Sequence, residues 1–584
     1  MAESQTSVLQ IHDIQGGGHR SPFEGQVVSE VLGVVTVEGE SSFWMETLGE
    51  FRDEDIATSE GLFVVLPNEE WTPSVGSVVK VAGRVEEQTP DRRPDDSSTT
   101  RLRATSVSLM RQGHPLPSAV VLGNQGRLPP KKTIDDDGGE IFDPAEEGRD
   151  FFESLEGMRV MVMRPRVVGP TTRFGEIVVL CEDGDGEQLS SRGALPVSEG
   201  VFHPSRIHLD DALVALPEAK VGDHLGASIT GVMDYSFGNP KVFVTETVIV
   251  QDGGLQAERA EGRPPGDRVL RVATYNVENL SPASGPETFA SLGRQIVEGL
   301  GSPDLIGIQE VQDDDGPESS DVVSAEETWG RLVAAVEDAG GPAYRWVDIS
   351  PEKGRDGGQP GGNIRVGFLW RTDRGLELVE RPGGTATAAT GGFLQGLLSP
   401  PGVSLTLSPG RIAPTSACWE GGRKPLAAEF NFRGWTLVVV VNHWKSKWGD
   451  TPLFGAVQPP LQNSRERRFS QAQVVRGFVE DLLGRDPDTS IIVLGDLNDF
   501  QFSPPVRLLG QGGLLFDLSE GLLPSERYSY VYEGNAQVLD HIFVTPNLLG
   551  AVSGYDVVHL NAEFPHGTSD HDPCLATLVV PSAD

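Results

Sequence analysis

Four short hydrophobic runs in the second half of the chain end in side chains that can hold a metal ion or a phosphate. These runs end at Asn276-Val277-Glu278, at Gln309-Glu310, at Asn442-His443 and at Gly495-Asp496-Leu497-Asn498. Buried strands read as short apolar runs, and functional groups gather where strands give way to loops. Acidic, amide and imidazole groups at several strand ends can therefore converge on one pocket.

Two Asp-His pairs follow nearer the C-terminus. Asp540-His541 opens the run His541–Val544, and Ser569-Asp570-His571 precedes the run Leu575–Val580. An imidazole can take a proton from water near neutral pH, and an adjacent carboxylate can bind a divalent cation. A lone Asp-His pair is usually a surface accident, but its place before a strand favours a functional role for Asp570 and His571.

Oxygen-bearing side chains dominate these strand ends. Glu310 ends a wholly apolar run, and a buried carboxylate there needs a partner, for which a cation is the natural choice. Asn276 and Glu278 can complete an oxygen-ligand set. Hard oxygen ligands without cysteine point to Mg²⁺, Mn²⁺ or Ca²⁺ rather than to a thiolate zinc site.

The remaining strand ends offer groups for a phosphate. Asp496 and Asn498 are two residues apart after a strand, so both can face a phosphoryl group; a simple Asp/Asn turn is the alternative. His443 is a candidate for proton transfer, with a structural histidine as the alternative, and Lys445 can meet phosphate.

Two arginines are further candidates for binding phosphate. Arg423 stands before the apolar run Leu426–Phe430, and Arg365 is a weaker version of the same pattern. A solvated surface arginine is the alternative for both.

The bulk composition describes a folded protein of several domains. The chain has 584 residues, of which 38% are hydrophobic and 23% charged, and such a length predicts about three or four domains. Its net charge of −38 disfavours a broad electrostatic hold on nucleic acid, so a polyanion must be attracted by local Arg and Lys and by a bound cation. Cys181, Cys418 and Cys574 are expected to be ordinary thiols, with a Cys418–Cys574 pair as the alternative.

Neither a membrane span nor a signal peptide is expected. No window approaches about 18 consecutive apolar residues, and the polar start Met1–Gln5 has no apolar core. The protein either stays inside the cell or is a mature form with an added Met.

Composition also predicts the domain organisation. Alternating runs rich in Val, Gly and Thr, with Val-Gly turns at Gly76 and Gly222, suit two related small barrels, and two unrelated β-domains are the alternative. Trp329, Leu332 and Val336 recur at helical spacing, which predicts a packing helix in the last segment. The predicted segments are a β-rich domain over 1–125, a linker over 126–149, a second β-rich domain over 150–252, a linker over 253–267 and a mixed domain over 268–584.

Taken in order, the motifs of residues 268–581 resemble those of the endonuclease/exonuclease/phosphatase superfamily, which contains deoxyribonuclease I and the exonuclease III-type abasic-site nucleases. More narrowly, the chain resembles bacterial secreted nucleases of this superfamily that have OB-like domains ahead of the catalytic domain. The strings that support the narrower resemblance are Ile11–Gly16, Phe151–Met158, Asn442–Lys447 and Leu453–Pro460.

The resemblance implies an α+β fold, in which a deoxyribonuclease I-like, four-layer α/β/β/α sandwich follows two small β-rich OB-like domains. It implies hydrolysis of a phosphodiester bond with Mg²⁺, for which Mn²⁺ or Ca²⁺ can substitute or assist. We therefore expect a monomeric nuclease of little sequence specificity, acting on DNA or also on RNA. The alternative is a phosphodiesterase or phosphatase for lipid headgroups, inositol phosphates or nucleotides.

The resemblance further implies a role for each candidate residue. Glu310 resembles the main metal ligand, and His571 resembles the imidazole that activates water, oriented by Asp540. His443 would protonate the departing oxygen. The other ligands near the metal would be Asn276, Glu278 and Asp570, and the residues that contact the phosphate or the leaving group would be Asp496, Asn498, Arg423, Lys445 and Arg365.

Two departures from the family pattern are visible. His541 stands where many members have Tyr, which leaves the site intact. The secreted subgroup favours an extracellular location, but the missing signal peptide keeps a cytoplasmic one open.

Aromatic residues outside the site bear on the substrate. Trp444, Trp448 and Phe454 can insert into a membrane or stack on bases. Phe43 and Trp44 are candidates for binding single strands on the first β-domain.

Overall fold

The computed structural model describes residues 9–67, 71–89, 94–260, 266–394 and 402–580, which form two compact units. Unit 1 comprises the chain up to Leu255 together with Asp450–Gln462 and Glu533–Asn535. Unit 2 comprises Gln256–Gly449, Asn463–Tyr532 and the chain from Ala536 onward. The polar start Met1–Gln5 and the prolines of the predicted second linker, Pro264 and Pro265, lie outside the described residues.

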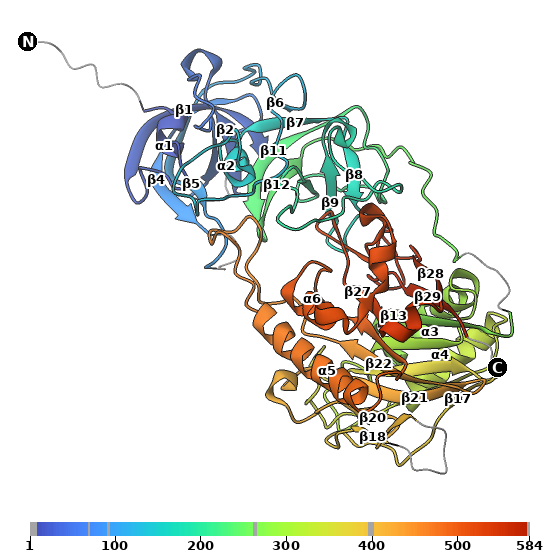
Figure 1. Cartoon of the computed structure of the whole chain (residues 1–584). Helices are drawn as coiled ribbons and strands as arrows, with labels where there is room; N and C mark the ends of the chain where they lie inside the picture. Colours follow the sequence, from blue (N-terminus) through green and yellow to red (C-terminus); the bar gives the residue numbers. More distant parts are fainter. Residues whose placement is uncertain (1–8, 68–70, 90–93, 261–265, 395–401, 581–584) are drawn as a thin grey trace, which may run out of the picture. The chain divides into compact units, whose positions relative to one another are not determined.

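Unit 1 begins with a closed five-stranded barrel of order β1-β2-β3-β5-β4 (Figure 1). Strands β3 and β5 pair in parallel, and β1 and β4 pair antiparallel. The short helix α1 (Ile11–Gln15) buries Ile11 and Ile14 in the core of the barrel. The barrel strands are β1 (Val27–Glu38), β2 (Ser42–Glu46), β3 (Gly61–Val65), β4 (Val78–Gln88) and β5 (Thr99–Arg111).

The second β-rich segment of unit 1 forms an open seven-stranded sheet of order β6-β7-β11-β12-β10-β9-β8. It differs from the small barrel expected of this segment, because the outer strands β6 and β8 pair with one neighbour each. Helix α2 (Gly148–Glu153) packs Phe151 and Phe152 into its core. The strands are β6 (Val120–Leu122), β7 (Arg159–Met163), β8 (Arg166–Gly169), β9 (Ile177–Leu180), β10 (Ile207–Asp210), β11 (Ser228–Ser236) and β12 (Asn239–Val244).

Unit 2 contains two large sheets. One has six strands: β15 (Tyr344–Asp348), β16 (Arg365–Arg371), β14 (Leu305–Val311), β13 (Val269–Leu280), β29 (Cys574–Val579) and β28 (Val552–Val557), in spatial order. The other runs β17 (Leu376–Leu378), β21 (Leu426–Phe432), β22 (Trp435–His443), β23 (Ile491–Asp496), β27 (Asp540–Val544) and β24 (Phe516–Asp517), with β20 (Gly410–Arg411) paired to β21. Two small hairpins join β18 (Gly392–Leu394) to β19 (Val403–Leu405) and β25 (Tyr530–Tyr532) to β26 (Asn535–Gln537).

The helices of unit 2 cover these sheets. Figure 1 places α3 and α4 on one side of the sheets and α5 and α6 on the other. The spacing of Trp329, Leu332 and Val336 predicts α4 correctly, and all three side chains are buried. The helices are α3 (Gly285–Arg294), α4 (Glu326–Asp338), α5 (Arg465–Arg485), α6 (Pro504–Gly510) and α7 (Pro546–Leu549).

The central strands are apolar on both faces because both faces are covered. Successive side chains of a strand point to opposite faces. In β23, Ile492 and Leu494 join the core that also contains residues of the six-stranded sheet, whereas Ile491 and Val493 join the core with α5 and α6. These continuous apolar runs bring their polar last residues to the edge of a rigid core.

Cys181, Cys418 and Cys574 are free thiols, so the expectation of ordinary thiols holds and the alternative Cys418–Cys574 pair is not formed. Among the helices of the described residues, none has the length and apolar character that a membrane span requires.

Candidate active site

Strand register brings the predicted side chains together. Strands β22 and β23 run in parallel with His443 opposite Asp496, and β23 pairs with β27 so that Asp496 lies opposite Asp540. On the other sheet, β13 and β14 run in parallel with Asn276 opposite Gln309, next to Glu310. Because parallel strands end at the same edge of a sheet, the polar residues that end each apolar run meet there.

His571 and Asp540 form a buried pair. The Nδ1 atom of His571 lies 2.6 Å from Oδ2 of Asp540, and Ser529 Oγ donates a hydrogen bond of 2.8 Å to the same oxygen. The Nε2 atom of His571 lies 3.9 Å from Oδ2 of Asp496. Asp540 therefore fixes the ring so that Nε2 faces the remaining carboxylates.

Opposing electrostatic effects act on His571 and Asp496. Burial alone lowers the pKa of His571, but the charges of Asp540, Asp496 and Asp570 outweigh it and raise that pKa well above its usual range. Burial raises the pKa of Asp496 to about 7; the charge of His571 opposes this shift, and the charges of Asp540 and Glu310 add to it. Groups this close titrate as one unit, so the proton belongs to the pair rather than to either residue alone.

His443 is the second imidazole of the cluster, and its environment has the opposite effect. Its Nε2 atom lies 3.5 Å from Oε1 of Glu310 and 3.4 Å from Oδ2 of Asp496. Burial, helped by the positive charges of Arg423 and His571, lowers the pKa of His443 well below its usual range. One imidazole is thus held charged and the other neutral, a divergence of pKa values that is typical of active sites.

Glu310 lies between the two sheets' strand ends. The Asn276 amide nitrogen donates hydrogen bonds of 3.1 Å to both Glu310 Oε1 and Asp496 Oδ2, and its oxygen accepts the N–H of Glu278. The Asn276 amide therefore lies between the carboxylates of Glu310 and Asp496 and bonds to both. Burial raises the pKa of Glu310, and the charge of Asp570 adds to the effect.

Glu278 and Asp570 are exposed residues next to this buried cluster. Besides burial, the charge of Asp570 raises the pKa of Glu310, so the Asp570 carboxylate lies close to the cluster. Their part in binding a metal stays a prediction.

The backbone is strained where these strands end. Glu278, Asn279, Glu310 and Asn498 have φ angles of 48°, 50°, 66° and 52°, in the left-handed region that side chains rarely adopt. Such conformations cost about 1–3 kcal/mol each and cluster at functional sites. The register of β13 against β14 shifts between Asn276 and Leu280, which turns the last residues of β13 out of the regular ladder.

Asp496 and Asn498 form a turn and belong to the cluster at the same time. The backbone N–H of Asn498 donates to Asp496 Oδ1 at 2.8 Å, and its amide nitrogen donates to Oδ2 at 2.9 Å. The Asp/Asn turn and the functional interpretation are therefore compatible.

The three predicted phosphate-binding residues have different outcomes. Arg423 is 8% exposed and donates from Nη2 to the carbonyl of Trp444 at 2.7 Å, so the solvated-surface alternative is wrong for it. Lys445 is half-buried beside the site, with Nζ 5.5 Å from the ring centre of Trp448. Arg365 is buried and bonds to Asp348 and to the carbonyl of Asn363.

The Arg365 guanidinium therefore serves a structural role, because among the described residues it pairs with Asp348 rather than with the cluster. Its solvated-surface alternative is also wrong, because the side chain is 1% exposed.

Three residues of the site were not predicted from the sequence. The Tyr530 ring lies with its centre 4.7 Å from that of His571, and the neighbouring Ser529 bonds to Asp540. Asn561 donates to the carbonyl of His571 at 2.8 Å. None of the three follows a long apolar run, so the strand-end pattern gives no signal for them.

His541 lies apart from the catalytic cluster. Its Nδ1 atom lies 2.8 Å from Oδ2 of Asp517, and Nε2 lies 3.1 Å from the carbonyl of Asp499. Because neighbouring residues of β27 face opposite sides, Asp540 faces the site while His541 is a core residue.

The comparisons with known proteins agree with this geometry. A family model described as the Endonuclease/Exonuclease/phosphatase family matches residues 273–571, just over half of the chain. The chain therefore belongs to this family, whose members are hydrolases that act on phosphoester bonds and generally use divalent metals. A second model, described as a domain of unknown function (DUF8508), matches residues 121–252. A sequence search of curated proteins finds no match.

Solved structures of this fold resemble the chain at low identity. An endonuclease/exonuclease/phosphatase from Bacteroides vulgatus is 18% identical, with a TM-score of 0.34, over 54% of this chain and 99% of that one. A mannosyl-6-phosphatase from Bacteroides thetaiotaomicron is 19% identical, with a TM-score of 0.33, over 53% and 98%. TDP2 from D. rerio, in complex with a single-strand DNA product, is 16% identical, with a TM-score of 0.33, over 53% and 98%. These likenesses do not distinguish a nuclease from a phosphatase.

The residues present fit the divalent metal that the family generally uses. Glu310, His443 and Asp496 each offer a ligand atom within 4.8 Å of the others. The two carboxylates, Glu310 and Asp496, are the donors that Mg²⁺ or Mn²⁺ prefers, and no thiolate is among the three groups. The charge of Asp570 beside the buried Glu310 is the kind of repulsion that a cation relieves.

Proposed function

We propose that the chain is a divalent-metal-dependent phosphodiesterase that acts as a nuclease on DNA, and also on RNA, with little sequence preference. The observation that supports this most is the His571–Asp540 pair at 2.6 Å, with Nε2 of His571 directed at Asp496. Glu310 would hold the metal, with Glu278 and Asp570 beside it.

Each residue then has a defined task. His571 accepts the proton of the attacking water at Nε2, and Asp540 holds the ring in the required orientation. A bound divalent cation would polarise the phosphoryl oxygens and lower the pKa of His571 toward neutrality. Asp496 and Asn498 position the phosphate, and His443, held neutral, can hydrogen-bond to the departing oxygen, which takes its proton from solvent. The buried guanidinium of Arg423 stabilises negative charge that develops in the site.

The surface beside the site favours a nucleic acid over a small phosphate ester. Trp448 is 85% exposed, five residues beyond His443, and the ammonium of Lys445 lies 5.5 Å from its ring centre. An exposed ring beside a cation suits a stacked base and its phosphate. The other two aromatic candidates were wrong, because Trp444 is 0% and Phe454 is 1% exposed and both belong to the core.

We also propose an architecture for each unit, based on the apolar cores of unit 2 and on the barrel of unit 1. Distinct apolar cores lie between the two sheets of unit 2 and beneath its helices, which supports a four-layer α/β/β/α sandwich. The closed order β1-β2-β3-β5-β4 supports an OB-like first domain. The barrel residues suggested for strand binding were wrong, because Phe43 is 0% and Trp44 is 5% exposed. We propose that this barrel is a scaffold.

The substrate class is tested by incubating the full chain with circular plasmid, linear duplex, single-stranded DNA and RNA. Each is given Mg²⁺, Mn²⁺, Ca²⁺ or a chelator, and parallel reactions contain bis-p-nitrophenyl phosphate, an inositol phosphate and sphingomyelin. We expect metal-dependent nicking of plasmid that the chelator abolishes. Cleavage of the lipid or inositol ester with intact plasmid would overturn the nuclease and favour the phosphatase alternative.

The monomeric state and an extracellular location also remain proposals. Light scattering of the purified chain should give the mass of one copy, and a dimer mass would contradict the first. Activity in the culture medium rather than in the cell lysate would support the second.

A further inference from the structure

A loop of unit 1 brings several acidic side chains together. In the sequence, this loop lies far from the strand ends described above. The two ends of the loop 134–147 lie side by side. There Gly148 N–H donates to Thr133 O at 2.9 Å, and Arg149 N–H donates to Ile134 O at 3.0 Å. Asp135, Asp137 and Glu147 each offer a carboxylate oxygen within 4.8 Å of the others. This stretch, predicted as part of a linker, is thus a closed loop with convergent carboxylates.

Local turns explain two of the three carboxylates. Asp135 Oδ1 accepts the N–H groups of Gly138 and Gly139 at 2.8 and 3.1 Å. Asp137 accepts the N–H of Glu140 at 2.8 Å in the same way. Such bonds shape the loop and need no ligand.

Glu147 is different. Its Oε1 atom accepts the N–H of Asp136 at 2.9 Å, but Oε2 is buried without a hydrogen-bond partner among the residues that the structure describes. The residue is 5% exposed. An orphaned polar atom in such a place costs about 1–3 kcal/mol, and the carboxylate that carries it converges with those of Asp135 and Asp137.

The charges around the loop favour a cation of charge two. Arg149 pairs with Asp135 at 2.9 Å and neutralises one of the three carboxylates, which leaves an excess of two negative charges. The fold therefore brings these groups together against their mutual repulsion.

The neighbouring histidine is not a ligand. The Nε2 atom of His19 lies 2.9 Å from Asp150. Burial lowers the pKa of His19, but the hydrogen bonds and charges of Asp150 and Glu153 outweigh it and raise that pKa to about 9. This nitrogen faces Asp150, and the two groups that converge with Glu147 offer carboxylate oxygens alone.

We infer that the loop of residues 134–147 holds a calcium-type divalent cation between Asp135, Asp137 and Glu147. Three convergent carboxylates suit Ca²⁺, whereas Mg²⁺ keeps several waters and takes one or two carboxylates. The cation supplies the partner that Glu147 Oε2 lacks. It also secures the loop immediately before α2, whose Phe151 and Phe152 pack into the core of the sheet.

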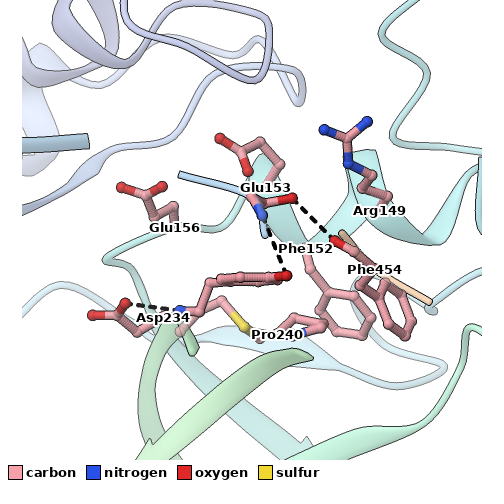
Figure 2. A pocket seen from close by; sticks show the side chains of 10 residues that line it. Arg149, Phe152, Glu153, Glu156, Asp234, Pro240 and Phe454 are labelled. Atoms are coloured by element: carbon pink, nitrogen blue, oxygen red, sulfur yellow. Dashed lines mark hydrogen bonds between the residues drawn. The ribbon is translucent and has the colours of Figure 1, made fainter. Parts of the chain in front are cut away.

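The cavity next to this loop is not a second ligand site. Figure 2 shows Arg149, Glu153, Glu156 and Asp234 around it, with the rings of Phe152 and Phe454 side by side. Its volume of about 20 Å³ has room for roughly one water molecule.

The test uses the full chain with Glu310→Gln, which removes the main carboxylate of the strand-end cluster. Ca²⁺ alone is titrated by calorimetry, and the melting temperature is measured with Ca²⁺ and with a chelator. Glu147→Gln preserves the shape of the side chain, and the exposed neighbour Glu146 provides the matched control Glu146→Gln. Asp137→Asn, at a half-buried position, is a second variant in case Glu147→Gln folds poorly.

We expect the parent and Glu146→Gln to bind one Ca²⁺ and to melt at a higher temperature with it. Glu147→Gln and Asp137→Asn should weaken binding about tenfold or more, the effect of disturbing a metal site. Equal affinity in all variants, or no Ca²⁺-dependent stabilisation of the parent, would overturn the inference. Because these readouts are independent of turnover, a failed nuclease assay would leave them unaffected.

Discussion

Both units bury carboxylates, but they assemble them differently. In unit 2, Glu310, Asp496 and Asp540 come from three strands, and imidazoles face them. In unit 1, Asp135 and Glu147 belong to one loop and face backbone N–H groups and Arg149. The first arrangement exists only when both sheets are folded, and its charges can move protons. The second arrangement lies within a single loop and can only bind a ligand.

Unit 1 also contains buried carboxylates outside the loop. Glu46 is 0% exposed, and its oxygens accept from the N–H of Arg159 and from the Arg52 guanidinium. These hydrogen bonds account for the burial of the Glu46 carboxylate without a ligand. A perturbed carboxyl pKa alone therefore does not identify a site, and convergence of several groups is needed.

The largest expected effect comes from the imidazole of the strand-end cluster. His571→Ala should lower the rate of plasmid nicking about 10²–10⁴-fold, because a positioned proton acceptor contributes that much. The exposed His566 provides the control His566→Ala, which should nick at the wild-type rate. Equal rates for both variants, with unchanged melting temperatures, would remove His571 from the chemistry.

The two carboxylate regions should separate cleanly in activity. Glu310→Gln should reduce nicking in Mg²⁺ on the order of 10²-fold, because charge stabilisation by a metal is worth several kcal/mol. Glu147→Gln should leave kcat within about twofold, since Glu147 accepts its hydrogen bond from Asp136 of its own loop and belongs to a separate carboxylate cluster. A comparable loss in both variants would show that the two regions act together.

Burial of Glu46 predicts a pH-dependent stability. Burial raises the pKa of Glu46 to about 7 from 4.5, and the hydrogen bond from Arg159 and the charge of Arg52 only partly oppose it. The folded state therefore holds this proton more tightly than the unfolded chain. Its contribution is most favourable below about pH 4.5 and is lost as the pH rises toward 7, by about 3 kcal/mol in total.

Glu46→Gln removes this titration. Melting curves between pH 5 and pH 8 should show the wild type losing more stability with rising pH than the variant. Parallel pH profiles would contradict the assignment.

The substrate surface is tested at Trp448. Trp448→Ala should raise KM for single-stranded DNA by an amount that corresponds to about 1–3 kcal/mol, the worth of one base stacked on an aromatic ring. Hydrolysis of bis-p-nitrophenyl phosphate, which has no base, should be unaffected. An equal loss on both substrates would assign Trp448 to the site itself rather than to nucleic-acid binding.

The smallest expected effect concerns Tyr530, a positioning residue. Tyr530→Ala removes the ring next to His571, and an aromatic contact of about 0.5–1.5 kcal/mol predicts a loss in kcat of about two- to tenfold. Tyr530→Phe keeps the ring and should restore the rate without a change in KM. If both variants lose activity equally, the hydroxyl rather than the ring is what matters.

The strand-end residues were predictable because their signal is local. An apolar run that stops at Asn276, Glu310, His443 or Asp496 indicates both a buried strand and its functional end. The motifs at these strand ends also follow one another in the order that the family shows. Ser529 and Tyr530 lie at the start of a short hairpin, and only tertiary folding brings them to His571.

Exposure and domain shape were harder to predict. Trp444 and Phe454 are buried because of packing partners that composition does not reveal. Arg365 bonds to Asp348 on the neighbouring strand β15, where Asp348 lies opposite Gly367 and 17 residues away from Arg365 in the sequence. The Asp and Gly residues of 135–139 are typical of linkers, yet their side chains cap the turns of an ordered loop.

The central claim is that Glu310 and His571, from separate segments of unit 2, serve one reaction. A double-mutant cycle on plasmid nicking in Mg²⁺ tests it most directly, with Glu310→Gln, His571→Ala and the double variant. Residues that act as a unit are strongly non-additive, so the double variant should be within about a few-fold of the slower single variant. Losses that multiply fully would mean that the two side chains act independently, and the single site proposed here would not exist.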